Sequence, residues 1–422
     1  MIKPSAPKRA IIVGAGRRVQ NNFLPAFRCL SNLFELRGIH SRTPERLRQV
    51  ASQWRVPALS SLAGADLSSV DLVAISVPTA ENEAVLRQLL PHARHLRILI
   101  DTPIAWNAQE MERTGPLLEQ FASVSVAEDY MNFPAFSLVR DAVRQGVVGR
   151  PKSLSLFNIG YLYHGLALIR SFEGFTPATG SWRQTLGSHA TIVGYQFQSG
   201  FTATVIGPYR RHDCGGGLLL EGANGIITEA SIDAHSGLTG GATYVLDAVR
   251  PRGKLTGYRL SGPNFEIAVD LQHIQMMRDM NFEDKSEINL VRGCGLIEVI
   301  RSIFHERNIN RSYGYKNAFY DSIVSQRADK GQLPLDPNRI LPVGGRRLKG
   351  KANIDTFLKL RTDDANTLTA DQKLSIKATD LIEADRYEFQ GNHAALFGVR
   401  VNERTLPGET WFLYPPAWNF LG

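Results

Sequence analysis

The chain has 422 residues, of which 43% are hydrophobic and 21% are charged, an ordinary balance for a protein with two or three packed domains. No apolar stretch approaches the length of about 18 residues that a membrane helix needs, and the first residues lack the apolar core of a signal peptide. The net charge of +8 comes without a block of consecutive basic residues. It therefore argues against nucleic acid as the partner and fits an anionic small ligand.

Three cysteines, Cys29, Cys214 and Cys294, lie far apart in the sequence. Their odd number and wide spacing fit neither a disulfide framework nor a cysteine-based metal site. We therefore expect no bound metal and a location in the reducing cytoplasm.

A strand, a glycine turn and a helix follow one another near the N-terminus. Ala10–Val13 is an apolar run suited to a strand buried on both faces, and a helical pattern follows the turn. Free backbone N–H groups at the start of such a helix bind a pyrophosphate, although Val19 stands where the dinucleotide fingerprint has its third glycine. A glycine turn in any α/β unit is the alternative. The residues that we assign to the cofactor here are Gly14, Gly16, Arg17 and Arg18.

The second strand, Glu35–Ile39, is followed by Ser41, Arg42 and Thr43. In a dinucleotide fold this strand end meets the adenosine ribose, where an acidic residue binds the 2′-hydroxyl and an arginine accommodates a 2′-phosphate. A guanidinium and two hydroxyls without a carboxylate predict NADP(H) as the cofactor. A polar turn in which Thr43 caps the helix that begins at Pro44 is the other interpretation, and the two are compatible.

Two further buried strands, Val70–Val77 and Leu96–Ile100, alternate with helical patterns, and a short strand, Ser123–Val126, comes next. This alternation predicts a doubly wound parallel sheet of the α/β class. Its ligand should lie at the carboxyl ends of the strands. Further cofactor-binding residues expected at these ends are Ser76, Pro78, Asp101 and Pro103.

Six short motifs together resemble the Gfo/Idh/MocA family of sugar-type oxidoreductases. They are Val-Gly-Ala-Gly at 13–16, Thr-Pro-Glu-Arg at 43–46, Ser-Val-Pro-Thr at 76–79, Asp-Thr-Pro at 101–103, Tyr-Met-Asn-Phe-Pro-Ala at 130–135 and Gly-Val-Val-Gly-Arg-Pro at 146–151. The resemblance covers roughly residues 8–335. It implies a Rossmann domain, then an α+β domain with a large, open, mostly antiparallel sheet, and hydride transfer between a nicotinamide cofactor and a small molecule. The open sheet also predicts a homo-oligomer, because its exposed face must be covered.

We accordingly expect an NADP-binding Rossmann domain at 1–130, an α+β domain for substrate binding and oligomerisation at 131–340, and a small β module at 350–422. The linker Gly344–Lys351 is rich in glycine and basic residues, and it precedes a tail that the family does not normally carry. Alternating apolar residues in this tail, as in Lys373–Ala378, predict a small β-barrel or SH3-like module of unknown role.

The chain departs from the family in its catalytic residues. The family's usual set is a lysine in a Glu-Lys-Pro motif and an Asp-x-x-x-His motif at the start of a helix. Here Thr102 stands in place of the lysine, Gly160 in place of the aspartate, and His164 matches the histidine. Biliverdin reductases and thiazolinyl imine reductases resemble this pattern in lacking the lysine, and both reduce conjugated or imine bonds with NAD(P)H.

An imine or a conjugated bond needs less help than a carbonyl, so a weak acid or a bound water can complete the proton transfer. We assign this step first to His164, because histidine exchanges protons near neutral pH, and second to Tyr130. Thr102 would position substrate or water. Tyr161 and Tyr163 are further local candidates, and a buried ring with a satisfied hydroxyl is the alternative for each tyrosine.

Three functions follow from this reading. The leading one is an NADPH-dependent reductase that acts on a C=N bond or a conjugated C=C/C=O bond. The second is a sugar or polyol dehydrogenase with a rearranged proton donor. The third is a catalytically silent NADP(H)-binding sensor or scaffold that uses the tail as its interaction module.

Overall fold

The computed structural model places most of the chain. It describes residues 6–186, 190–207, 216–229, 242–304 and 313–330, and in the tail residues 348–352, 355–360, 366, 368–369, 372–384, 386–390, 393–397, 399–406, 411–413 and 418–420. The chain forms two compact units, Met1–Leu335 and Asp336–Gly422. Within the described ranges, no helix is long and apolar enough to cross a membrane.

The first half of the larger unit is a six-stranded sheet in the order β3-β2-β1-β4-β5-β6, with every neighbouring pair parallel. Its strands are β1 Lys8–Val13, β2 Phe34–His40, β3 Ala58–Leu59, β4 Leu72–Ile75, β5 Arg97–Asp101 and β6 Ser123–Ala127. The inner strands are wholly apolar at their centres, and Ala10–Val13 is buried as expected for a strand covered on both faces. The predicted doubly wound parallel sheet is confirmed, and its strand order reverses between β1 and β4.

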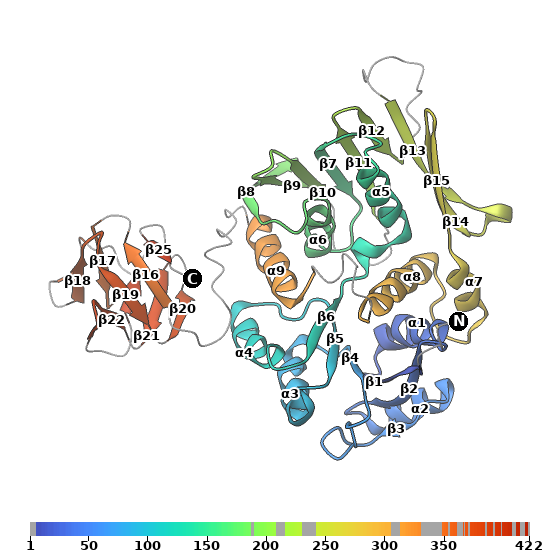
Figure 1. The fold of residues 1–422 in the computed structure, drawn as a ribbon, viewed down its shortest axis with the longest axis horizontal. Helices are drawn as coiled ribbons and strands as arrows, with labels where there is room; N and C mark the ends of the chain where they lie inside the picture. Colours follow the sequence, from blue (N-terminus) through green and yellow to red (C-terminus); the bar gives the residue numbers. More distant parts are fainter. Residues whose placement is uncertain are drawn as a thin grey trace. The chain divides into compact units, whose positions relative to one another are not determined.

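Helices connect these strands in the order expected for a doubly wound sheet (Figure 1). They are η1 Val19–Phe23, α1 Leu24–Cys29, α2 Pro44–Trp54, α3 Thr79–Leu89, η2 Leu90–His92 and α4 Ala108–Leu118. The segment η1 is a π-helical turn that runs directly into α1. Such turns widen a helix locally and occur frequently at functional sites.

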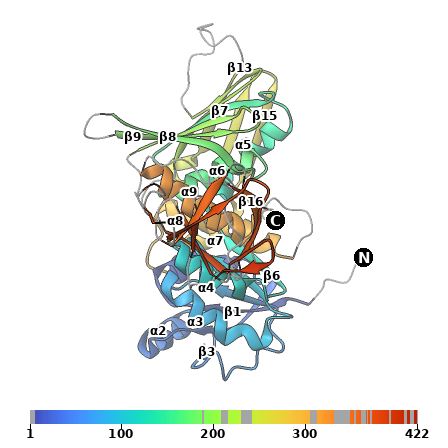
Figure 2. The ribbon, with the colours of Figure 1, turned by 90° about the vertical axis from the view of Figure 1, so that its left-hand side faces the viewer.

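The second half of the unit contains a nine-stranded sheet in the order β15-β14-β13-β12-β11-β7-β10-β9-β8. Six of its neighbouring pairs are antiparallel and two are parallel, so the large, mostly antiparallel sheet is confirmed. Its strands are β7 Pro151–Phe157, β8 Ala178–Leu186, β9 Ala190–Phe197, β10 Thr202–Ile206, β11 Gly217–Gly222, β12 Gly225–Thr228, β13 Ala242–Val249, β14 Gly257–Gly262 and β15 Phe265–Asp270. Figure 2 shows β8 and β9 projecting together at one edge.

Helices α5 and α6 pack against this sheet, and α8 packs against the parallel-sheet half of the unit (Figure 1). The remaining helical segments are η3 Tyr130–Asn132, α5 Pro134–Arg144, α6 Leu162–Phe172, η4 Pro251–Gly253, α7 Gln272–Asp279, α8 Glu287–Ser302 and α9 Tyr315–Asp329. A buried ion pair, 2.7 Å between Arg170 Nη1 and Asp321 Oδ1, joins α6 to α9. It fixes the helix that carries His164, because removing one partner would leave a buried charge unpaired.

Some elements of this half differ from the sequence-based expectation. Helix α8 begins at Glu287, and its first turns carry the polar residues Glu287 and Asn289. Strands β8, β9 and β14 were not predicted. Their sequences contain Gly, Ser, Arg and Gln at positions that alternation alone does not assign to a strand.

The smaller unit consists of two five-stranded sheets, in the orders β23-β22-β19-β16-β25 and β18-β17-β24-β21-β20. The strands are β16 Leu348–Ala352, β17 Thr356–Lys359, β18 Lys373–Ile376, β19 Leu381–Ala384, β20 Arg386–Gln390, β21 His393–Phe397, β22 Arg400–Val401, β23 Arg404–Thr405, β24 Trp411–Leu413 and β25 Trp418–Phe420. Leu358, Ile376, Leu396 and Leu413 are completely buried in its own apolar core. Residues 344–347 of the expected linker lie outside the described residues.

Candidate functional site

The carboxyl ends of β1, β2, β4 and β5 surround one cavity of about 460 Å³. This is the edge at which an open α/β sheet binds its ligand, next to the point where the strand order reverses. All the predicted cofactor residues except Pro103 line it: Gly14, Gly16, Arg17, Arg18, Ser41, Arg42, Thr43, Ser76, Pro78 and Asp101. We call it the cofactor cavity below.

The two glycines of the N-terminal turn have different tasks. Gly14 has a φ of +122°, and a Cβ there would stand 2.1 Å from the carbonyl oxygen of Ser76 on the neighbouring strand connection. A Cβ on Gly16 would meet no atom within 4 Å. Gly14 therefore closes the turn against the sheet, whereas Gly16 leaves open space above the backbone, as a phosphate in contact with a helix start requires.

The end of β2 presents a basic group to the cavity. Arg42 and Arg46 line it together with Ser41 and Thr43. Thr43 occupies the N-cap position of α2, but its side chain makes no capping hydrogen bond. A polar turn therefore accounts for the position of Thr43 but gives its hydroxyl no capping role. The Thr43 backbone N–H donates a hydrogen bond of 3.4 Å to Ser41 Oγ, which leaves the hydroxyl hydrogen of Ser41 to meet a ligand.

A carboxylate that the sequence did not predict also reaches this end of the cavity. Glu81, in the first turn of α3, pairs with Arg42 at 2.8 Å between Oε1 and Nη1. We expected no carboxylate where the adenosine ribose would bind. This holds for residues 41–43, but Glu81 brings a carboxylate to the same place from α3. Because Arg42 is 74% exposed, this pair is held weakly and can exchange for a stronger anionic partner.

Arg18 lies at the other end of the cavity and bridges two carboxylates. Its Nη1 is 2.7 Å from Asp129 Oδ2, and its Nε is 3.4 Å from Asp101 Oδ1. The hydroxyl of Ser76 donates a hydrogen bond of 2.8 Å to Asp101. Through these contacts Arg18 joins the ends of β4, β5 and β6, so the three strand ends behave as one polar cluster.

The charges of this cluster influence one another. Burial disfavours the charged form of Arg18, yet Asp101 and Asp129 hold its pKa above the ordinary value. Burial raises the pKa of Asp101, against the opposing effect of Arg18. Asp101 and Asp129 both contact the one guanidinium of Arg18, and the neighbouring Glu128 contacts His164 instead.

His164 lies in the first turn of α6 and is held by Glu128. Its Nδ1 is 2.7 Å from Oε1 and 2.9 Å from Oε2 of this carboxylate, which is fully buried. The imidazole itself keeps 16% of its surface exposed. Because Nδ1 is engaged, Nε2 is the ring atom left to meet a substrate, as in histidines that a carboxylate orients for acid–base catalysis.

Sequence reasoning missed Glu128 and Asp129, although a signal was present. Both residues directly follow β6, so they stand at the same edge of the sheet as Ser76 and Asp101. The carboxyl end of β6 lies at the ligand-binding edge of the sheet like the other strand ends of the site. Gly160 leaves the usual aspartate position empty, and Glu128 supplies a carboxylate to His164 from a different element.

Aromatic rings surround the imidazole. Tyr130 stacks on it with 5.6 Å between ring centroids, and Tyr163 and Tyr161 lie at 4.3 Å and 6.0 Å. Tyr163 also contacts the half-exposed ring of Trp106 edge-to-face. Burial, followed by the charges of Glu128 and Asp101, raises the pKa of Tyr163 well above its ordinary value, which makes it a poor proton donor.

The other two predicted catalytic residues contribute differently. The hydroxyl of Tyr130 packs against the chain at Gly216, where a Cβ would stand 2.0 Å from the hydroxyl oxygen. Thr102 is half-buried next to Asp101, and its backbone N–H donates a hydrogen bond to the Asp101 carboxylate. The structure therefore brings His164 and Tyr130 together, with Thr102 at the adjoining strand end.

Neither a lysine nor a metal site is found here among the residues that the structure describes. No lysine lines the cofactor cavity, and no group of three or more His, Cys, Asp or Glu could hold a metal ion in the described ranges. The donors present are thus suited to phosphates and to proton transfer.

The contrast between the two glycines gives a direct test of the cofactor cavity. Gly16→Ala should fold with unchanged thermal stability, because its Cβ meets open space, but should bind dinucleotide about tenfold or more weakly, because the Cβ occupies the phosphate position. Gly14→Ala is the matched variant and should lower the melting temperature itself. Calorimetric titration and thermal melts measure both effects. Unchanged dinucleotide affinity in a well-folded Gly16→Ala protein would place the pyrophosphate elsewhere.

Comparisons with known proteins agree with this geometry. Residues 8–127 match the model of a family described as an oxidoreductase family with an NAD-binding Rossmann fold, GFO_IDH_MocA. No curated protein matches the chain.

Solved structures resemble nearly all of the larger unit. An oxidoreductase from Agrobacterium radiobacter in complex with NAD+, L-tartaric acid and magnesium is 12% identical with a TM-score of 0.57, covering 80% of this chain and 100% of that one. A putative myo-inositol dehydrogenase from Sinorhizobium meliloti is 13% identical with a TM-score of 0.54, over 77% and 97%. A 3-ketoreductase from Actinomadura kijaniata in complex with NADP is 14% identical with a TM-score of 0.50, over 77% and 98%.

At these identities the solved structures establish the shared fold, and the family match establishes the cofactor class. The glycine turn and the cavity at the strand ends occupy the matched region. Residues 8–127 of the chain are thus similar to the NAD-binding Rossmann domain of the Gfo/Idh/MocA oxidoreductase family.

Proposed function

We propose that the protein is an NADP(H)-dependent reductase that transfers hydride to a C=N bond or to a conjugated C=C/C=O bond of a small molecule. The observation that carries this proposal is the His164–Glu128 pair, which lies beside the polar cluster at the strand ends where Thr102 replaces the family's lysine. The pair supplies a proton donor without a cationic lysine. A substrate that needs little electrophilic activation fits such a site best.

The residues of this chain divide the chemistry between them. NADPH supplies the hydride when it is bound in the cofactor cavity. His164, protonated at both ring nitrogens, donates its Nδ1–H to Glu128 and presents Nε2–H to the substrate atom that gains the proton. Glu128 orients the ring and balances its positive charge, and Tyr130 restricts the ring by stacking on it. Thr102 positions the substrate or a water molecule.

The charge of the site supports an imine in particular. Two carboxylates, Asp101 and Asp129, contact the single guanidinium of Arg18, and Glu128 balances the protonated His164. The local potential therefore favours the positive charge that an imine gains when it accepts the proton. An imine that has received its proton from His164 is cationic and planar, and the aromatic rings beside His164 offer faces that attract such a cation. It also accepts hydride more readily than a neutral carbonyl does.

One observation favours a second candidate, a sugar or polyol dehydrogenase with a rearranged proton donor. Glu128 gives His164 the carboxylate partner that the position of Gly160 lacks, and such a pair can remove the proton of a hydroxyl. The putative myo-inositol dehydrogenase among the structural neighbours acts, by its name, on a polyol.

A substrate panel separates these functions. NADPH oxidation would be measured with cyclic imines, conjugated enones and keto-sugars, and NADP+ reduction with polyols. Turnover of imines or enones at rates well above those of keto-sugars supports the proposal. Preference for polyols or keto-sugars selects the second candidate, and tight NADPH binding without any turnover selects the sensor.

Preference for NADPH rests on Arg42. Arg42→Ala should weaken NADPH binding about tenfold while changing NADH binding little, because a charge-assisted bond to the 2′-phosphate is lost from an exposed position. Glu81→Gln is the opposite variant: it releases Arg42 and removes a competing carboxylate, so NADPH should bind more tightly and NADH no better. Fluorescence titration with both cofactors measures the ratio. An equal loss for the two cofactors in Arg42→Ala would show that Arg42 does not read the 2′-phosphate.

The proton donor is tested in the same assay. His164→Ala should lower turnover by about a hundredfold or more with NADPH affinity unchanged, the usual effect of losing an acid–base group. Glu128→Gln should also lower turnover, because the amide keeps the contact but not the charge. Tyr130→Phe keeps the stacked ring and removes only the hydroxyl. Loss of activity in Tyr130→Phe but not in His164→Ala would make Tyr130 the donor.

We also propose a homo-oligomer in the cytoplasm. Apolar side chains on the nine-stranded sheet, such as Trp182 at 41% and Leu219 at 38%, remain exposed in the single chain, and a second copy would cover them. Cys29 and Cys294 are free thiols, as a reducing compartment requires, and Cys214 lies outside the described residues. Sedimentation velocity at micromolar concentration should show a dimer or larger species, and a clean monomer would refute the assignment.

A further inference from the structure

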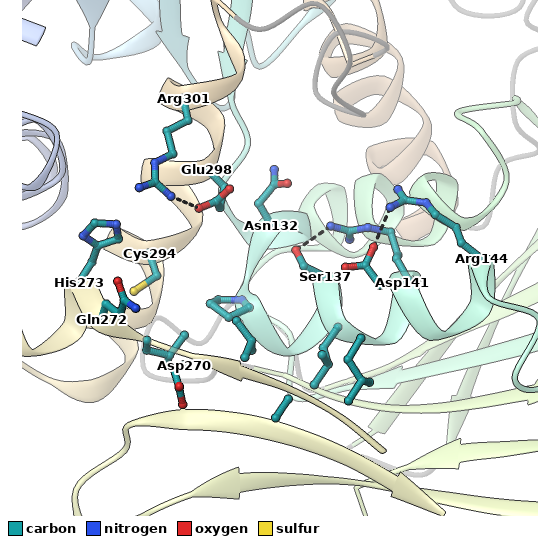
Figure 3. Close-up of a pocket in the computed structure, with 17 residues that line it drawn as sticks. Asn132, Ser137, Asp141, Arg144, Asp270, Gln272, His273, Cys294, Glu298 and Arg301 are labelled. Atoms are coloured by element: carbon teal, nitrogen blue, oxygen red, sulfur yellow. Dashed lines mark hydrogen bonds and ion pairs between the residues drawn. The ribbon is translucent and has the colours of Figure 1, made fainter. Parts of the chain in front are cut away.

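A second cavity, of about 500 Å³, lies between α5 on one side and α7 and α8 on the other, with the end of β15 as its floor (Figure 3). It shares no lining residue with the cofactor cavity. Its size suits a small organic molecule. Polar side chains from both walls face it, among them Asn132, Ser137 and His273.

The wall formed by α5 contains a buried guanidinium. Arg140 is only 4% exposed and lines the cavity. Its hydrogen bonds go to the carbonyl of Met131, to Ser171 Oγ at 3.4 Å and to Ser137 Oγ at 3.0 Å. All three acceptors are neutral, and no carboxylate of the described residues forms an ion pair with Arg140. Buried charges are normally paired, so this one lacks its counter-charge.

The acidic residues nearby are engaged elsewhere or exposed. Asp141 pairs with Arg144 at 2.8 Å, and Glu298 pairs with Arg301 at 3.2 Å. Asp270 lies at the solvent-exposed end of β15. None of these three carboxylates forms an ion pair with Arg140, although the charge of Asp141 opposes part of the effect of burial on its pKa.

The opposite wall adds a second unsatisfied group. Among the described residues, Nδ1 of His273 on α7 is buried and makes no hydrogen bond. Burial, together with the nearby charge of Arg301, lowers the pKa of His273. On α5, burial and then the charge of Arg144 lower the pKa of Arg140 to about 9. Both shifts have the sign expected where positive charge is buried without enough negative charge near it.

We propose that this cavity binds a small organic oxyanion, a carboxylate or a phosphate ester, with Arg140 as its principal anchor. A bound oxyanion supplies the missing counter-charge and accepts charge-assisted hydrogen bonds from the guanidinium. Ser137 and His273 lie on the two walls and contribute neutral contacts. The site is separate from the cofactor cavity and does not depend on the proposed reductase activity.

The test uses a variant that supplies the counter-charge from within the chain. Ser137 already receives a hydrogen bond from Arg140, so Ser137→Asp places a carboxylate beside the guanidinium. It also puts an acidic residue near the start of α5, where the helix dipole favours it. Ser137→Asn has the same size without the charge and is the matched control. Substituting Arg140 itself is avoided, because the guanidinium also holds the Met131 carbonyl.

Calorimetric titration of the full chain with inorganic phosphate and with succinate, at saturating NADPH and constant ionic strength, measures the site. Saturating NADPH prevents either anion from entering the cofactor cavity. We expect one saturable site in the parent protein and in Ser137→Asn, and affinity lower by about tenfold or more in Ser137→Asp. The anion that binds more tightly identifies phosphate or carboxylate as the ligand's group.

Thermal melts without ligand provide the second readout. Ser137→Asp should melt above both the parent and Ser137→Asn, because it pairs the buried charge. Absence of saturable binding of both anions in the parent protein overturns the proposal. So does binding that Ser137→Asp leaves unchanged, since the anion would then lie away from Arg140.

Discussion

The contact between Glu128 and His164 connects the two halves of the larger unit. Glu128 ends the parallel sheet and His164 begins a helix packed on the large sheet, and 2.7 Å separates their bonded atoms. A fully buried carboxylate needs a partner, so the contact fixes both the position of α6 and the direction of the imidazole. The buried pair of Arg170 and Asp321 holds the far end of the same helix. These two buried contacts therefore hold both ends of α6, and with them the imidazole of His164.

Much of this architecture was predictable, because it depends on local patterns. The parallel sheet follows from buried strands that alternate with helices, and the strand-end rule located Gly14, Arg42, Ser76 and Asp101 around one cavity. Each of these residues is the last of its own strand or lies within two residues of that strand's end, so no knowledge of long-range packing was needed. Strands β8, β9 and β14 were harder, since their stability comes from cross-strand partners that a single segment does not reveal.

The partners of the site residues were not predictable in the same way. Glu81 on α3 contacts Arg42. Glu128 contacts His164 and so takes the part of the aspartate for which Gly160 stands in this sequence. Such pairs join residues far apart in the sequence, and only the folded chain brings them together. They also change the chemistry: Glu128 gives His164 a carboxylate although Gly160 provides none. A catalytic set inferred from motif spacing alone would therefore miss the carboxylate that contacts His164.

The most direct measurement is a crystal structure of the full chain with NADP+. We expect the pyrophosphate over Gly16, the 2′-phosphate against Arg42 in place of Glu81, and the nicotinamide ring between Asp101 and the Nε2 side of His164. A nicotinamide directed away from His164, or a 2′-phosphate with no contact to Arg42, would contradict the account.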